Sequence, residues 1–189
     1  MRTSAVRRTE VRFAGFGGQG IISAGKITGR AASIFDGQDA VLMQSYGPEA
    51  RGGACNADLV ISTVPIGYPQ LDIPDLLIIM SQEAYDKYGH TLKAEGILII
   101  DEDLVNLTGD VSTDRVFKIP ATRLAEGLGR KIVANVVMLG ALTAITGVVS
   151  KDAMREAILS SVPPKTKDLN GRAFDLGYEQ GKGALDGAS

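Results

Sequence analysis

A glycine-rich stretch near the start of the chain is the first place where residue types and spacing could do chemistry. Residues 11–26 read VRFAGFGGQGIISAGK, and Gly15, Gly17 and Gly20 stand at the spacing G-x-G-x-x-G. A short apolar run precedes the motif and a helical pattern follows it, which is the context that a dinucleotide-binding turn requires. Glycines let the backbone turn tightly and let a phosphate approach, and the free N–H groups at a helix start bind the anion. The motif therefore indicates a tight turn suited to phosphate.

Two phosphate-binding patterns overlap in this stretch, and each lacks a residue that its chemistry needs. A dinucleotide site places an acidic residue at the end of the second strand, where it binds the ribose hydroxyls. Here that strand ends in residues 43–45 (MQS), and Asp36 and Asp39 precede it. Residues 20–26 match a P-loop, but Ile27 stands where Ser or Thr would hold magnesium. Neither a dinucleotide site nor a P-loop is therefore expected.

The glycines have other uses. Gly25 and Gly29 stand four residues apart in a helical pattern, and a glycine inside a helix costs up to about 1 kcal/mol against alanine. We expect them to form a flat helix face that presses on a sheet. For Gly15 to Gly20, Gly18 included, a tight turn alone and an anion-binding turn both stay open. Gln19 favours the second, because a polar amide at a helix start can point at a ligand or a partner.

Residues 44–58 (QSYGPEARGGACNAD) form the second unusual stretch. Glycine and proline break the chain straight after one strand, and a glycine pair breaks it again before the next. Glu49 and Arg51 stand between these breaks, so a short, pinned loop carries two charges. One interpretation is a solvated connection. The other is a rigid loop that presents Glu49 and Arg51 to an anionic ligand or a partner subunit, since the arginine fork suits carboxylate or phosphate.

No nucleophile–base pair is evident elsewhere. Cys55 is the only cysteine and His90 the only histidine. One cysteine excludes an internal disulfide and an Fe–S cluster ligated by this chain alone, and we expect Cys55 to be a small buried residue in a strand. His90 is expected at the surface. Asn135 lies among apolar neighbours, so it must find hydrogen bonds if buried, at the glycine turn or at a subunit interface.

Strands and helices that must position these residues alternate along the first two thirds of the chain. Strand-length apolar runs stand at residues 11–16, 40–45, 55–62, 75–80, 96–101 and 115–119. Helical patterns stand at residues 19–35, 81–93, 121–129, 131–146, 150–162 (with Ser150 as N-cap) and 168–182. Continuous Ile/Leu runs suit strands that are covered on both faces. The order predicts an α/β fold, a single three-layer α/β/α domain around a central, largely parallel (mixed) sheet.

The length and net charge of the chain limit the number of domains and the classes of partner. We expect 189 residues to form one domain, spanning residues 10–183, with flexible tails at 1–9 and 184–189. A net charge of −2 argues against nucleic acid as a partner. Residues 135–149 form the longest apolar run, shorter than the roughly 18 residues that a membrane span needs. A cytoplasmic protein without a membrane partner is expected.

Three motifs in order carry a family resemblance over residues 10–180. GFGGQG at the start, SYGPEARGG after the second strand and NVVMLGAL on a late helix resemble the gamma subunit of 2-oxoacid:ferredoxin oxidoreductases. The form GPEARGG, in place of GPERRGA, is similar to the 2-oxoglutarate branch more than to the pyruvate branch.

The resemblance implies a complex that oxidatively decarboxylates a 2-oxoacid with coenzyme A, giving acyl-CoA, carbon dioxide and reduced ferredoxin. It implies alpha and beta partner subunits, with a ferredoxin-like delta subunit in some complexes, and ferredoxin as electron acceptor. Thiamine diphosphate, magnesium and Fe–S clusters are then expected on the partners, since this chain has one cysteine and no GDG…N thiamine diphosphate signature. The chain itself would bind no cofactor alone and would complete a shared site, with coenzyme A as the candidate shared ligand.

The candidates for cofactor binding or subunit contact are Gly15, Gly17, Gly18, Gln19, Gly20, Tyr46, Gly47, Pro48, Glu49, Arg51, Gly52, Gly53 and Asn135. None is a candidate for catalysis or for a metal. Two alternatives stay open: a free-standing nucleotide- or coenzyme-binding Rossmann-like module, and the indolepyruvate branch of the same superfamily.

Overall fold

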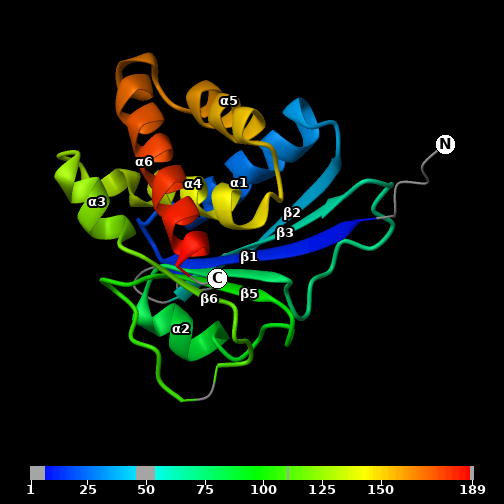
Figure 1. The fold of residues 1–189 in the computed structure, drawn as a ribbon. Coiled ribbons are helices and arrows are strands. Elements are labelled where there is room, and N and C mark those ends of the chain that lie inside the picture. The colour runs from blue at the N-terminus through cyan, green and yellow to red at the C-terminus, as the bar shows by residue number, and fades with distance from the viewer. Residues whose placement is uncertain (1–6, 46–53, 110, 188–189) are drawn as a thin grey trace.

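The computed structural model describes residues 7–45, 54–109 and 111–187 (Figure 1). The strands are β1 (Arg8–Phe16), β2 (Asp39–Ser45), β3 (Ala54–Ser62), β4 (Leu76–Ile79), β5 (Ile97–Asp101) and β6 (Val116–Ile119). The helices are α1 (Ile21–Arg30), α2 (Gln82–Tyr88), α3 (Ala121–Gly127), α4 (Ala134–Thr146), α5 (Lys151–Ser161) and α6 (Lys167–Asp186). A π-helical turn, η1 (Ala31–Phe35), extends α1, and a short 3₁₀ turn, η3 (Lys131–Val133), leads into α4. Each predicted strand or helix range holds an element of the predicted type.

The six strands form one mixed sheet in the order β2-β3-β1-β4-β5-β6. β1, β4, β5 and β6 are parallel, whereas β3 runs antiparallel to both of its neighbours, β1 and β2. The C-terminal ends of every strand but β3 therefore meet at one edge of the sheet, together with the start of β3. We call this edge the carboxyl edge. The prediction of a largely parallel, mixed sheet is confirmed.

Helices cover both faces of the sheet unequally. Figure 1 shows α1, α4, α5 and α6 on one face and α2 on the other. Successive strand side chains point to opposite faces, so each face has its own core: Phe13, Leu59 and Ile99 pack with the four helices, and Leu77 and Ile100 pack toward α2. Strands covered on both faces explain the continuous Ile/Leu runs. The predicted α/β/α layering is confirmed.

Glycines allow α1 to lie directly on the sheet. A Cβ at Gly25 would come within 2.9 Å of both Ala57 Cβ and Leu42 Cδ1, and one at Gly29 within 3.2 Å of Leu59 Cδ1. Contacts under 3.0 Å force something to shift, so Gly25 has no room for a side chain. The predicted packing role of both glycines is confirmed.

α4 is the most enclosed helix. α6 crosses it with backbone against backbone: a Cβ at Gly177 would overlap the Val137 carbonyl, and one at Gly140 would overlap the Phe174 carbonyl. The apolar run that forms α4 is thus covered by protein. No helix within the described ranges is long and apolar enough to cross a bilayer.

The regular elements reach further toward both ends than the sequence suggested. Residues 8 and 9 were expected in a flexible tail, but they belong to β1, where Arg8 pairs with Ser62 across the antiparallel ladder. Residues 184–186 likewise continue α6. Periodicity missed both because the pairing of β1 with β3 and the contacts of Leu185 with the core are long-range. Ser150 caps α5 as predicted, its hydroxyl accepting a hydrogen bond from the Ala153 N–H at 3.2 Å.

Candidate functional site

The glycine turn, residues 15–20, joins β1 to α1 at the carboxyl edge. Gly18 and Gly20 have φ of 99° and 76°, in the region that L side chains rarely adopt. Gln19 N–H closes the turn on the Phe16 carbonyl at 3.3 Å. Gly20 is the N-cap of α1 and supplies no side-chain cap, and no acidic residue stands in the first turn. The turn is therefore as tight as predicted, and the N-terminus of α1 has no capping side chain.

Gln19 is engaged inside the chain. Its Oε1 accepts from the Phe16 N–H at 2.9 Å, and its Nε2 donates to the Met80 carbonyl at 2.5 Å. A Cβ at Gly15 would collide with the same Oε1. We expected this amide to point at a ligand or a partner. In the structure it instead connects the end of β1 to the residue that follows β4. Sequence could not show this, because Met80 lies 61 residues away.

Asn135 holds the other side of the turn. Its Nδ2 donates to the Gly20 carbonyl at 3.3 Å, from the first turn of α4. Asn135 is buried, and a Cβ at Gly20 would overlap its amide nitrogen. We expected Asn135 to find its hydrogen bonds either at the glycine turn or at a subunit interface, and the structure shows one at the glycine turn.

A small apolar pocket of about 320 Å³ opens beside the turn. Its wall is formed by Phe16, Gly18, Gln19, Met80, Thr122, Lys131, Ile132 and Ala134. In open α/β sheets, ligands bind outside the carboxyl ends of the strands, and this pocket lies there, between the ends of β1 and β4. Phe16 is 40% exposed and Ile132 64% exposed. The pocket is therefore bordered by apolar side chains that solvent reaches.

Asp101 is a buried carboxyl at the same edge, and it was not among the residues expected at the site. It ends β5, and its Oδ2 accepts from Thr122 Oγ1 at 2.7 Å and from Thr122 N–H at 3.0 Å. Its Oδ1 accepts from the Asp103 N–H at 3.1 Å. Burial raises the pKa of Asp101, and these hydrogen bonds offset that only in part. Its role is to fix the start of α3 beside the pocket. The sequence signal that could have found Asp101 is an acidic residue at the end of a buried strand.

The second sequence motif lies largely outside the described residues. Tyr46, Gly47, Pro48, Glu49, Arg51, Gly52 and Gly53 all belong to residues 46–53, which the structure does not describe. The strand ends that bracket them are described: β2 ends at Ser45, and β3 begins at Ala54, which pairs with Phe16. Both ends lie at the carboxyl edge, so the motif leaves and rejoins the sheet on the side that carries the glycine turn.

The order of the strands agrees with the expectation that no acidic residue binds a ribose at the glycine turn. β3, not β2, lies beside β1, and it runs the opposite way, so the residue paired with Phe16 is Ala54. Asp39 begins β2 at the far edge of the sheet. The Asp36 carboxylate accepts hydrogen bonds from both the N–H and the hydroxyl of Ser150, each at 2.7 Å. Neither acid is placed to reach a nucleotide at the glycine turn.

The remaining reactive side chains do not assemble into a site. Cys55 is half-buried in β3 against the core, and burial raises the pKa of its thiol; His90 is exposed after α2. Within the described ranges, no three His, Cys, Asp or Glu side chains lie close enough to hold a metal ion.

A buried ion pair on the α2 face was likewise not expected from the sequence. Arg12 donates to both carboxylate oxygens of Asp58, at 2.8 and 2.7 Å, and Asn56 donates to Oδ1 at 2.9 Å. Burial alone would lower the pKa of Arg12, but the Asp58 carboxylate keeps it raised. Every polar group of the pair is satisfied from within the fold, so we assign it a structural role.

Comparisons with known proteins agree with the resemblance over almost the whole chain. A family model described as pyruvate ferredoxin/flavodoxin oxidoreductase matches residues 10–180. The 2-oxoglutarate synthase subunit KorC of Methanocaldococcus jannaschii is 52% identical over 177 residues, which are 93% of this chain and 95% of that protein. The ketoisovalerate oxidoreductase subunit VorA of Methanothermobacter thermautotrophicus is 34% identical over 181 residues, covering 94% of this chain and 37% of that protein.

A solved structure has the same fold. The gamma subunit of a keto/oxoacid ferredoxin oxidoreductase from Geobacter sulfurreducens superposes with a TM-score of 0.86 at 45% identity, over 94% of this chain and 98% of that one. The resemblance stated from three short motifs is thereby confirmed. The chain belongs to the pyruvate ferredoxin/flavodoxin oxidoreductase family.

Proposed function

We propose that this chain is the gamma-type subunit of a cytoplasmic 2-oxoacid:ferredoxin oxidoreductase whose substrate is 2-oxoglutarate. The complex decarboxylates the 2-oxoacid with coenzyme A, and gives acyl-CoA, carbon dioxide and reduced ferredoxin. Support for the substrate is the higher identity to the 2-oxoglutarate synthase subunit, 52%, than to the ketoisovalerate oxidoreductase subunit, 34%. The GPEARGG form of the second motif agrees with it.

One structural observation favours a subunit that completes a site over an enzyme that works alone. The carboxyl edge offers backbone groups of the glycine turn, an apolar pocket and the exposed side chains of Phe16 and Ile132. The polar side chains described there have partners within the chain: Gln19, Asn135, Asp101 and Thr122 through hydrogen bonds, and Lys131 through an ion pair with Glu126 at 3.8 Å. Such an edge has the composition of a contact surface, and the described residues place no nucleophile beside a base.

The redox and thiamine chemistry then belongs to the partners. An Fe–S cluster needs several thiolate ligands, and this chain has only Cys55. We therefore assign thiamine diphosphate, magnesium and the clusters to alpha and beta subunits or to a ferredoxin-like delta subunit, and we assign the electrons to ferredoxin.

Coenzyme A is the ligand that we propose this chain shares with its partners. Its phosphates would meet the N-terminus of α1, which has no side-chain cap and where a Cβ at Gly18 would have nothing within 4 Å. Helix N-termini favour anions through free N–H groups and the helix dipole. Arg51, which lies outside the described residues, would supply the charge that the described part of the turn lacks.

Assembly tests the proposal as a whole. The tagged chain is co-expressed with alpha and beta subunits, and 2-oxoglutarate- and coenzyme A-dependent dye reduction is measured for the complex and for each part. We expect activity only in the complex, and less with pyruvate than with 2-oxoglutarate. Failure to assemble, together with tight binding of NAD, FAD or coenzyme A by the isolated chain, would instead support a free-standing nucleotide-binding module.

Arg51→Ala tests the coenzyme A contact separately. In the assembled complex we expect the KM for coenzyme A to rise about tenfold or more, since charge-assisted hydrogen bonds contribute about 1.5–3 kcal/mol. The KM for 2-oxoglutarate should not change. The control is Arg115→Ala, because Arg115 precedes β6 at the opposite edge of the sheet. An unchanged KM for coenzyme A in Arg51→Ala would refute the contact.

A further inference from the structure

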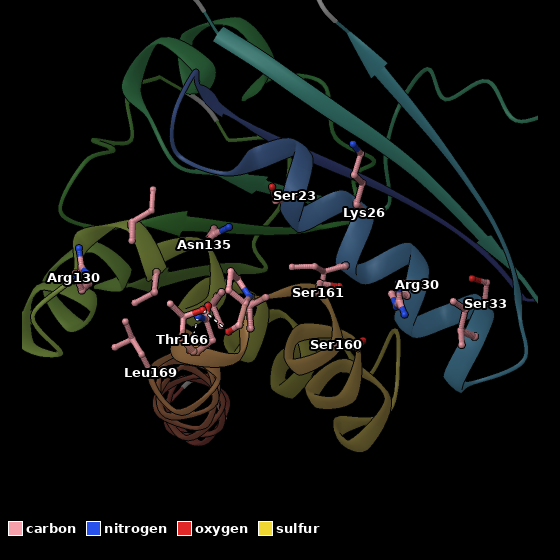
Figure 2. A pocket seen from close by; sticks show the side chains of 18 residues that line it. Ser23, Lys26, Arg30, Ser33, Arg130, Asn135, Ser160, Ser161, Thr166 and Leu169 are labelled. Carbon is pink, nitrogen blue, oxygen red and sulfur yellow. Dashed lines mark hydrogen bonds between the residues drawn. The ribbon is translucent and has the colours of Figure 1, made fainter.

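A second and larger depression, of about 940 Å³, lies on the helical face of the molecule. α1 and η1 form one wall, η3 and the start of α4 form another, and the connection from α5 to α6 forms the third (Figure 2). Ile132 lines both this depression and the small pocket at the carboxyl edge. We call it the cationic groove, for the reason given next.

Three basic side chains line the groove, and no acidic one does. Lys26 and Arg30 project from α1, and Arg130 lies at the far end, before η3 (Figure 2). Of the eighteen described residues that line it, none is Asp or Glu. No described carboxylate forms an ion pair with any of the three, whereas Lys93, on another surface, bridges Glu10 and Asp75. A local surplus of positive charge in a chain of net charge −2 indicates an acidic binding partner.

Apolar side chains accompany the charges. Ile34 and Ile132, at the rim, are 61% and 64% exposed, and they rank among the most exposed large apolar side chains of the described residues. Ile27, Val133 and Val136 form a buried apolar floor. Exposed apolar residues beside a groove, surrounded by polar ones, mark a protein contact more often than a site for a small ion.

We propose that the cationic groove receives an acidic, amphipathic segment of a partner subunit, an inference that rests on the proposed function. Apolar residues of the segment lie on the floor and against Ile34 and Ile132, and its carboxylates pair with Lys26, Arg30 and Arg130. Lys26 and Arg30 stand four residues apart on α1, so they lie on one face of the helix. Two carboxylates one helical turn apart on the partner would match them.

A small anionic ligand fits these observations less well. A phosphate site gathers its donors around one point, often at a helix N-terminus. Here the basic side chains are all exposed, and Arg130 lies on a different wall from Lys26 and Arg30. Lys26 and Arg30 stand along α1 beyond its first turn. A segment that spans the groove can reach all three charges and cover both isoleucines.

Charge reversal tests the proposal in the assembled complex. Lys26→Glu/Arg30→Glu is compared with Arg115→Glu/Lys118→Glu, which changes net charge equally on exposed residues at β6, the edge strand farthest from β2. The Kd of each full-length variant for the purified alpha and beta subunits is measured from 50 to 300 mM salt. We expect the groove variant to bind at least tenfold more weakly at 50 mM salt and to lose most of its salt dependence, while the control stays within about twofold of the unsubstituted chain.

Two further measurements identify the contact. Ile34→Ser removes an exposed apolar contact without changing charge, and it should weaken assembly several-fold at every salt concentration. A zero-length carbodiimide reagent should join Lys26 to an Asp or Glu of a partner subunit, in a peptide with apolar residues at helical spacing. Unfolding curves that match the unsubstituted chain would show that the variants are folded.

The outcomes are separable from those of the proposed function. If the unsubstituted chain does not assemble, the proposed function and this inference both fail. If it assembles but the groove and control variants bind equally, the groove inference alone is wrong. It is also wrong if Lys26→Glu/Arg30→Glu leaves assembly intact and raises the KM for coenzyme A, because the groove would then be a ligand site.

Discussion

Replacing Gly20 by alanine tests whether the glycine turn is held by Asn135. Gly20 has φ 76° and ψ 25°, and an added Cβ would overlap the Asn135 amide. The left-handed conformation alone costs a residue with a Cβ about 1–2 kcal/mol. Moving the amide aside breaks its hydrogen bond to the Gly20 carbonyl and leaves a buried amide unpaired, which costs about 1–3 kcal/mol more. We therefore expect Gly20→Ala to lower the free energy of unfolding by about 2–5 kcal/mol.

Gly147→Ala is the matched control. Gly147, the C-cap of α4, has φ 57° and ψ 25°, and a Cβ there would meet nothing within 4 Å. It should lose only the conformational part, about 1–2 kcal/mol. Urea unfolding of both variants, of Asn135→Ala and of Gly20→Ala/Asn135→Ala gives a double-mutant cycle. The double variant should be more stable than the sum of the single losses predicts; equal losses for Gly20→Ala and Gly147→Ala, or an additive cycle, would refute the reasoning.

Two other predictions concern the helices and strands that carry the site. Gly177→Ala should lower the free energy of unfolding by several kcal/mol, because its Cβ would overlap the Val137 carbonyl in α4. Gly183→Ala on the same helix has open space around it, so it should be neutral or stabilising by up to about 1 kcal/mol. Equal thermal unfolding midpoints for the two variants would contradict the close crossing of α4 and α6. Because burial raises the pKa of Asp101, its carboxyl is most favourable to folding below its ordinary pKa of 3.8, and that contribution falls as the pH rises through the folded-state pKa. The unfolding free energy of the native chain minus that of Asp101→Asn should therefore decrease as the pH rises from 3.5 toward neutrality in urea titrations, and an increase would show that the hydrogen bonds from Thr122 outweigh burial.

Much of the fold could be predicted because its determinants are local. The runs at residues 75–80 and 96–101 are apolar throughout, and strands buried on both faces require that composition. Gly25 and Gly29 likewise reveal a helix that lies on a sheet, because a glycine in a helix interior is costly unless space demands it. Ser150 revealed the start of α5 by the usual side-chain cap.

The remaining features depend on contacts between distant parts of the chain. The sequence of residues 54–62 does not indicate that this strand runs antiparallel between β1 and β2, because the direction of a strand depends on the strands with which it pairs. The residues around Gln19 do not determine whether its amide faces a ligand or the Met80 carbonyl. The position of β4, which is set by long-range contacts, determines it. The partners of Asp101 and Arg12 could not be predicted from the sequence, since Thr122 and Asp58 lie 21 and 46 residues away from them.

The segment from Arg130 to Asn135 joins the two surfaces assigned to this chain. Ile132 borders both the small pocket and the cationic groove, and Asn135 lines the groove while its amide holds the Gly20 carbonyl. A partner segment in the groove would therefore contact residues that position the glycine turn. We expect assembly to protect the amide protons of residues 15–20 from exchange with solvent, even where no partner covers the turn, because Asn135 loses freedom to move. Protection that persists in the assembled Asn135→Ala variant would instead assign it to direct cover of the carboxyl edge, and unchanged exchange in the native complex would show that the two surfaces act independently.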